Sequence, residues 1–243
     1  MNKKSLWTLL LCTPLFLWAT HGLAYFIHEY CHSFSAWALG FKANPLALTY
    51  GHFNWSNVLL LQEVSENVDY APFMHQHPWL AAFIAFAGPG IGNGGLLALS
   101  IWVLCNQKPR GMIYLYFFLW FAAMNLGNLI SYVPVRTFAT HGDMMEIELF
   151  LNISPWILMI LFGYPVVFCL WYFYHRRLPK AYIQLQLCYA QRCIVFILLT
   201  LVIFGFFGSL PGLSGDYGDR THFLSLLFMY MIPITLVSCW PKK

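Results

Sequence analysis

Five consecutive residues, His28, Glu29, Tyr30, Cys31 and His32, form the pattern H-E-x-x-H. Residues four positions apart on an α-helix lie on one face, about one turn apart, so these two imidazoles could bind one Zn²⁺. The carboxylate of Glu29 could reach a water molecule on that metal and accept its proton. The pattern predicts a zinc site. The structural alternative is a set of polar side chains that reach from a helix end toward the membrane surface.

The composition indicates that this motif belongs to a membrane protein. Of the 243 residues, 60% are hydrophobic and 9% are charged, whereas soluble domains carry roughly 25% charged residues. We therefore expect an all-α, polytopic helix bundle in a lipid bilayer. The net charge of +4 comes without a clustered basic patch, which argues against nucleic acid as a partner. Histidine and glutamate are costly in lipid unless they have a function, and this favours the metal site.

Six apolar runs are candidates for membrane spans, since a helix needs about 20 apolar residues to cross a bilayer. They cover about 6–27, 79–105, 111–133, 153–174, 193–210 and 221–240, and the H-E-x-x-H motif ends the first. The second run contains Gly88, Pro89, Gly90 and Gly92, and small residues of this kind predict close packing inside the bundle.

The longest stretch between spans, about 39–78, has apolar residues in alternation at Leu46, Leu48 and Tyr50. This pattern predicts one or two short strands, or a re-entrant segment, after the first span. No repeat and no second soluble domain is visible, so residues 1–243 are expected to form a single membrane domain.

The distribution of Lys and Arg predicts the orientation, because cytoplasmic segments carry an excess of both. With a cytoplasmic N-terminus, three basic residues lie outside (Lys42, Arg136 and Arg220) and ten lie inside: Lys3, Lys4, Lys108, Arg110, Arg176, Arg177, Lys180, Arg192, Lys242 and Lys243. Six spans and two cytoplasmic termini follow. A cleaved signal peptide is the alternative for the first run, although its apolar stretch continues through 25–27, beyond a short signal core.

A catalytic zinc site needs a third protein ligand on the same side of the membrane and an open position for water. The outside loop between the third and fourth spans contains His141, Gly142 and Asp143. Asp143 could supply the third ligand, and its structural alternatives are a solvated loop acid or the N-cap of a helix. Other possible ligands are His141, Glu146, Glu148, and the loop pair His75 and His77.

Three motifs together resemble the site-2 protease family of intramembrane zinc metalloproteases. The first is H-E-x-x-H within a span, followed by the Ala-to-Gly continuation of residues 35–40. The second is Gly88-Pro89 followed by Asn93, one residue further on than in the commonest form of the family's Gly-Pro-x-x-Asn. The third is Asn128, Pro134 and Asp143, where the gap to the Asp is longer than usual and the Gly precedes the Asp instead of following it.

The resemblance covers about residues 20–145 and leaves the C-terminal helices, about 153–240, without a counterpart. It implies that Asp143 is the third zinc ligand beside His28 and His32. It also implies that Asn128 is a catalytic residue that donates a hydrogen bond to the substrate or to the developing oxyanion. Asn128 could instead make an ordinary contact between helices. The implied activity is hydrolysis of peptide bonds in or near the transmembrane segments of membrane-protein substrates, with Glu29 as the catalytic base.

The alternatives to a site-2 protease are another membrane metalloenzyme and a membrane protein without enzymatic activity. A zincin of the prenyl-protein protease type would use a downstream glutamate such as Glu146 as its third ligand, and a di-iron desaturase would need several His boxes that are missing here. A non-enzymatic alternative is a membrane scaffold or transporter with a metal-binding site. A transporter typically has paired, interrupted spans in two halves, and only the second span here is clearly interrupted by Gly and Pro.

Overall fold

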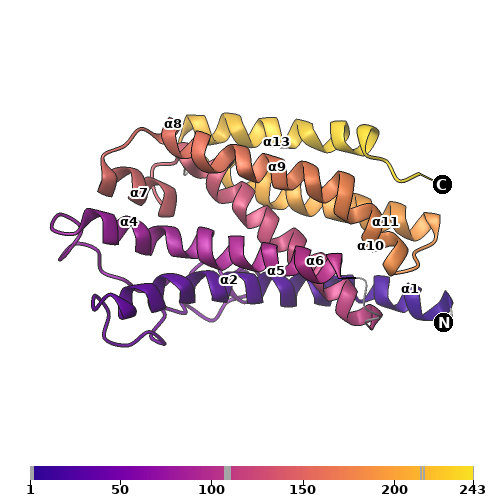
Figure 1. Ribbon diagram of the computed structural model, residues 1–243, viewed down its shortest axis with the longest axis horizontal. Coiled ribbons are helices and arrows are strands. Elements are labelled where there is room, and N and C mark those ends of the chain that lie inside the picture. The colour runs from indigo at the N-terminus through magenta and orange to yellow at the C-terminus, as the bar shows by residue number, and fades with distance from the viewer. Residues whose placement is uncertain (1–2, 107–110, 214, 216, 243) are drawn as a thin grey trace.

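The computed structural model describes residues 3–106, 111–213, 215 and 217–242. Within these ranges every regular element is a helix (Figure 1), so the all-α prediction is confirmed. Three residues that contributed to the predicted orientation, Lys108, Arg110 and Lys243, lie outside the described residues.

The first rod of the bundle consists of α1 (Lys3–Leu11) and the long α2 (Thr13–Ala38). A proline lies in the first turn of α2. Its missing N–H costs no hydrogen bond there, because the first N–H groups of a helix have no partner within the helix. The helix continues well beyond Ile27, the predicted end, because no helix breaker intervenes before Gly40, whose φ of 83° ends it. The H-E-x-x-H motif therefore lies inside a continuous helix and not at its end.

The second rod is one long helix with a widened middle: α4 (Pro78–Phe86), the π-helical η1 (Ala87–Gly94) and α5 (Gly95–Cys105). Pro89 cannot donate a backbone hydrogen bond, and such a gap favours the wider π turn. A Cβ at Gly92 would stand 3.1 Å from the Cα of His28, so glycine allows α2 and η1 to approach closely. The predicted packing of the small-residue run inside the bundle is confirmed.

The third rod, α6 (Met112–Ile130) with η2 (Ser131–Val135) and η3 (Arg136–Phe138), lies at the centre of the bundle. Every residue from 119 to 135 is buried. Tyr116, in the same helix, shares a hydrogen bond of 2.7 Å with the hydroxyl of Thr13, which ties the central rod to α2. After this rod the chain turns back, and α7 (Asp143–Leu151) packs against α4.

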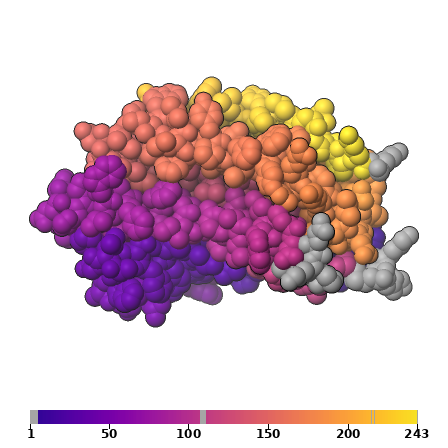
Figure 2. Space-filling view, in the orientation of Figure 1, coloured from indigo at the N-terminus to yellow at the C-terminus, as the bar shows by residue number. Residues whose placement is uncertain are grey.

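Three more rods complete the bundle. The fourth runs through α8 (Pro155–Leu158), η4 (Met159–Gly163), α9 (Tyr164–Tyr172), η5 (Phe173–Arg177) and α10 (Leu178–Gln184). The fifth comprises α11 (Tyr189–Thr200), η6 (Leu201–Ser209) and α12 (Leu210–Leu213), and the sixth is α13 (Asp219–Ser238). Figure 2 shows the N-terminal rods on one side of the molecule and the C-terminal rods on the other.

Five of the rods in the described part of the chain are long and apolar enough to cross a membrane: Pro78–Cys105, Met112–Phe138, Pro155–Gln184, Tyr189–Leu213 and Asp219–Ser238. The chain is a multi-pass membrane protein on this evidence. Helix α2 is not among the five, although it is 26 residues long, because His21, His28, Glu29 and His32 lower its hydropathy. Successive rods run in opposite directions, so both chain ends lie at the same end of the bundle (Figure 1).

The segment between α2 and α4 contains the short helix α3 (Trp55–Leu60) but no strand. Of the two predicted alternatives, the strands are wrong, because the alternating residues 46–50 contribute only one antiparallel bridge, between Thr49 and Ser65. The re-entrant segment stays a prediction. The ammonium group of Lys42 holds this segment together in place of a sheet. It donates hydrogen bonds to the backbone carbonyls of Ala47, Glu66 and Asn67.

Candidate metal centre

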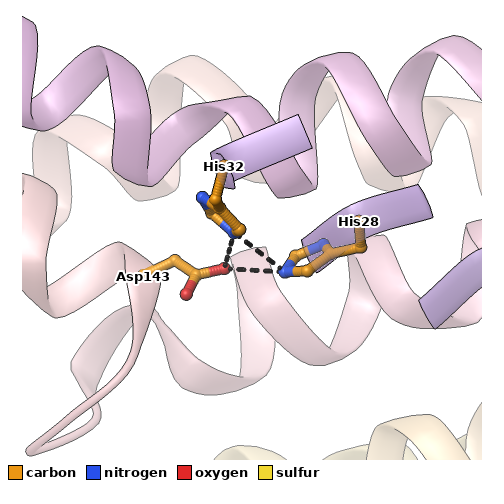
Figure 3. A group of neighbouring side chains, drawn as sticks. All are labelled: His28, His32 and Asp143. Atoms are coloured by element: carbon orange, nitrogen blue, oxygen red, sulfur yellow. Dashed lines mark hydrogen bonds and ion pairs between the residues drawn. The ribbon is translucent and has the colours of Figure 1, made fainter. Parts of the chain in front are cut away.

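The side chains of His28, His32 and Asp143 meet between α2 and the start of α7 (Figure 3). The Oδ2 atom of Asp143 lies 3.1 Å from Nε2 of His28 and 3.4 Å from Nε2 of His32. The two Nε2 atoms are 3.1 Å apart. Both imidazoles are buried, and the side chain of Asp143 is 17% exposed. Of the groups in the described chain, this one has the composition and proximity of a metal site.

The spacing of these three atoms can be compared with the geometry of zinc. Tetrahedral Zn²⁺ binds imidazole nitrogen and carboxylate oxygen at about 2.0–2.1 Å, which places neighbouring ligand atoms about 3.3 Å apart. The three separations of 3.1–3.4 Å match this value. The donor set, two nitrogens and one oxygen with a fourth position open, is also one that catalytic zinc sites use.

The orientation of the His32 ring is fixed by a backbone carbonyl. Its Nδ1 atom lies 2.6 Å from the oxygen of Ile84 in α4. A carbonyl oxygen can only accept, so Nδ1 carries the proton and donates it. In the neutral form of the ring, the Nε2 atom presents a lone pair toward Asp143 and His28.

The orientation of the His28 ring is fixed by a chain of two asparagines. Asn125 donates from Nδ2 to the carbonyl of Phe121 at 2.8 Å, so its Oδ1 faces Asn93. Asn93 donates to that oxygen at 3.1 Å, and its own Oδ1 lies 2.7 Å from Nδ1 of His28. This series of hydrogen bonds ends at a backbone carbonyl, which can only accept. The donor and the acceptor of each bond are therefore determined, and His28 must donate from Nδ1.

When both rings are neutral, three acceptor atoms converge with no donor between them. The Nε2 lone pairs of both neutral histidines point at the Oδ2 atom of Asp143, which is buried and makes no hydrogen bond. Electron-rich atoms this close repel one another in a buried site unless a proton or a metal cation lies among them. A metal ion bound at all three atoms satisfies them together, so the residues present fit a zinc ion.

Asp143 reaches the histidines because of the turn before α7. Gly142 has a φ of 101°, a conformation that favours glycine, and it occupies the N-cap position of α7. The N-cap alternative for Asp143 is therefore wrong, since Asp143 is the first helical residue.

Glu29 lies next to the three converging side chains. Its Oε1 atom is 4.0 Å from Nε2 of His28, too far for a direct hydrogen bond and close enough for one bridging water. The side chain is 6% exposed. The carboxyl group of Glu66, from the segment between α2 and α4, also interacts with it. Glu29 therefore has the position that a proton acceptor for a water at the metal would need.

The other acidic residues and histidines that the sequence offered as ligands lie apart from this cluster. Glu146 and Glu148 follow on α7, where burial raises the pKa of each to about 7, helped at Glu146 by the charge of Asp143. Neither belongs to the metal-site group in the described chain. His75 and His77 are exposed in a loop, and His141 stacks on Tyr217 with 4.3 Å between ring centroids.

Asn128 lies in α6 near the cluster but does not contact it. Its Nδ2 atom donates to the carbonyl of Met124 at 3.0 Å, one turn earlier in the same helix. An amide group has two N–H bonds, so a second one is available for a ligand. The side chain lines a cavity together with Tyr132, whose ring stacks on His28 with 4.7 Å between centroids.

Sequence reasoning missed several residues that support the cluster. Asn93 was predicted only as part of the Gly-Pro motif and had no assigned role. Asn125 and Tyr132 were not predicted as site residues. Polar residues within an apolar span were the available signal, because such residues are costly in lipid without a partner. The carbonyl of Ile84 carries no sequence signal, because every residue has a carbonyl group.

Gly88 gives a direct test of the packing around the metal centre. A Cβ at this position would overlap Nε2 of His32 and stand 2.7 Å from Nε2 of His28. We predict that Gly88→Ala prevents zinc binding although every ligand remains. The matched control is Gly95→Ala on the same rod, where a Cβ meets nothing within 4 Å. Zinc per mole of purified protein is the measurement, and equal zinc in both variants would contradict the packing described here.

Asn93 gives a test of the hydrogen-bond chain. Partners of ligating histidines typically contribute about 10–100-fold to metal affinity. We predict that Asn93→Ala weakens zinc binding by that factor, as measured by competition with a chelator. Ser100→Ala is the control, because Ser100 is equally buried on the same rod and donates its hydroxyl to the carbonyl of Leu96 in its own helix. Unchanged zinc affinity in Asn93→Ala would show that these hydrogen bonds do not position His28.

Comparisons with protein-family models, with curated proteins and with solved structures find no match for this chain. No relative therefore assigns a role to any residue. The case for a metal centre depends on the three converging atoms and on the hydrogen bonds that orient them.

Proposed function

We propose that the chain is an intramembrane zinc metalloprotease that hydrolyses peptide bonds in or near the transmembrane segments of membrane proteins. The observation that carries this proposal is the convergence of His28, His32 and Asp143 beside Glu29 in a bundle of apolar helices. The three motifs that resemble the site-2 protease family also support it, and the Gly88-Pro89-Asn93 motif does so with residues outside the converging group.

Each residue has a definite part in the proposed reaction. Bound zinc would lower the pKa of a water molecule toward about 7 and polarise the peptide carbonyl. His28, His32 and Asp143 hold the ion, with the histidine rings already oriented by Asn93 and Ile84. Glu29 accepts the proton of the attacking water and passes it to the leaving amine. The second N–H of Asn128 donates a hydrogen bond to the substrate.

The proposed topology has six spans, with α1–α2 as the first, and cytoplasmic termini. The position of both chain ends at one end of the bundle supports an even number of crossings (Figure 1). The excess of Lys and Arg in the segments at that end supports a cytoplasmic side. The metal centre then lies in the outer half of the bundle, since α7 lies at the end opposite the termini (Figure 1).

Glu29→Gln tests the activity with a substitution that keeps the shape of the side chain. We expect this variant to retain zinc and to lose cleavage of single-span membrane peptides by about 100-fold or more, since acid–base groups contribute about 10²–10⁴-fold. The assay uses protein in lipid nanodiscs and detects products by mass spectrometry. The control is Glu148→Gln, the same change on α7 away from the three ligands, which is expected to cleave normally.

Two results would contradict the proposal. Full cleavage by Glu29→Gln would remove the catalytic base from the mechanism. Stoichiometric zinc in a wild-type protein that cleaves no membrane peptide would favour the alternative of a metal-binding scaffold or transporter.

A further inference from the structure

A cavity of about 530 Å³ lies beside the metal centre. Its walls come from α2, the segment after α3, α6 with η2 and η3, and the end of the fifth rod. Its polar lining includes Tyr25, Asn128, Arg136 and Tyr217, and Phe206 and Phe207 supply part of an apolar wall. A volume of this size is typical of pockets that bind small groups with a few placed polar contacts.

Arg136 is the residue of permanent positive charge in the lining of this cavity. Its Nε atom donates to the carbonyl of Ser131 at 3.4 Å, and Nη1 donates to the hydroxyl of Tyr217 at 3.3 Å. The guanidinium carbon lies 4.1 Å from the centre of the Tyr132 ring and 5.3 Å from that of Tyr217. The cation is thus held between two aromatic rings.

Within the part of the chain that the structure describes, Arg136 forms no ion pair with a carboxylate. A guanidinium group has five N–H bonds, and the hydrogen bonds to Ser131 and Tyr217 use two of them. The negative charge of Asp143 acts on Arg136 without a direct ion pair, and a partly buried arginine in an apolar bundle is stabilised further by a carboxylate that it contacts directly. The planar fork of N–H bonds matches the two oxygens of a carboxylate, which it binds in a bidentate manner.

One wall of the cavity, the ring of Tyr132, borders the metal centre. The ring of Tyr132, against which Arg136 lies, stacks on His28 with an interplanar angle of 16°. Tyr25 precedes Glu29 by one turn of α2 and also lines the cavity. A group bound at Arg136 is therefore next to the place where the peptide bond would be cleaved.

We propose that Arg136 binds a carboxylate of the substrate in this cavity and so sets a preference for negatively charged substrates. The carboxylate is either an Asp or Glu side chain near the cleaved bond or the C-terminus of the substrate chain. This inference rests on the proposed protease function, whose substrate class it narrows. The wall at Tyr132 favours a substrate group over a lipid headgroup, because the occupant lies beside Glu29 and the metal ligands.

The test uses pairs of single-span membrane peptides that differ only in charge. One series carries Asp or Asn at successive positions of the segment expected to be cleaved, and a second series ends in a free carboxylate or an amide. We expect wild type to cleave the charged member of one series with kcat/KM at least about tenfold higher, as hydrogen bonds to a charged group imply. The series that responds identifies the source of the carboxylate.

Three variants connect this preference to the guanidinium. Arg136→Gln is expected to lose the preference, and Arg136→Lys to keep part of it, since an ammonium group cannot bind in a bidentate manner. Tyr217→Phe keeps the charge of Arg136 but removes the hydrogen bond between its guanidinium and the Tyr217 hydroxyl. This variant should have a weaker preference for charged peptides. Arg220→Gln is the matched control, because Arg220 is exposed, lies 5.9 Å from the Phe138 ring and does not line the cavity.

Failure of this proposal and failure of the protease function give different results. Equal cleavage of charged and neutral peptides by wild type overturns the carboxylate site and leaves the protease in place. If wild type cleaves no peptide, binding of fluorescein-labelled Asp and Asn peptides to Glu29→Gln, measured by anisotropy, still tests the site. Equal affinities in that measurement, or a preference that disappears when anionic lipid is added to the nanodiscs, would overturn the proposal.

Discussion

The hydrogen bonds that His32 and His28 donate from Nδ1 to the carbonyl of Ile84 and the side-chain oxygen of Asn93 determine what the rest of the site can do. Each bond places the proton of a ring on Nδ1 and leaves a lone pair at Nε2. With Asp143 in place and both rings neutral, three acceptors meet in a buried space, and this arrangement is stable only around a cation. The metal affinity, the role of Glu29 and the orientation of any substrate depend on that convergence.

The small residues of η1 let this constraint be met inside an apolar bundle. Gly88 and Gly92 bring the second rod against the helix that carries the histidines, so the carbonyl of Ile84 and the amide of Asn93 come within hydrogen-bond distance. In water, exposed polar groups could find other partners. In lipid they could not, so buried asparagines that bond one another are less costly than isolated ones.

The sequence predicted the parts of this molecule that follow from local spacing. The His pair four residues apart, the small-residue run and the apolar rods all depend on helical periodicity, and the structure has them. Asp143 followed from its predicted side of the membrane and from family resemblance. The rest depends on tertiary contacts: alternation at Leu46–Tyr50 predicted a strand that has no partner strand, and the direction of the Asn93–Asn125 chain depends on the Phe121 carbonyl. The contact between Arg136 and the Tyr132 ring was likewise not predictable from the sequence, because it depends on the fold.

X-ray absorption at the zinc edge of the reconstituted protein tests the central claim most directly, because it reports the atoms around the ion. With wild type we expect three protein ligands and one water at about 2.0–2.1 Å, with the outer-shell signal of two imidazoles. With Asp143→Ala, one oxygen ligand should be lost and both imidazoles retained. No bound zinc in wild type, or a zinc ion with fewer than two imidazoles, would contradict the assignment of His28, His32 and Asp143 as a metal centre.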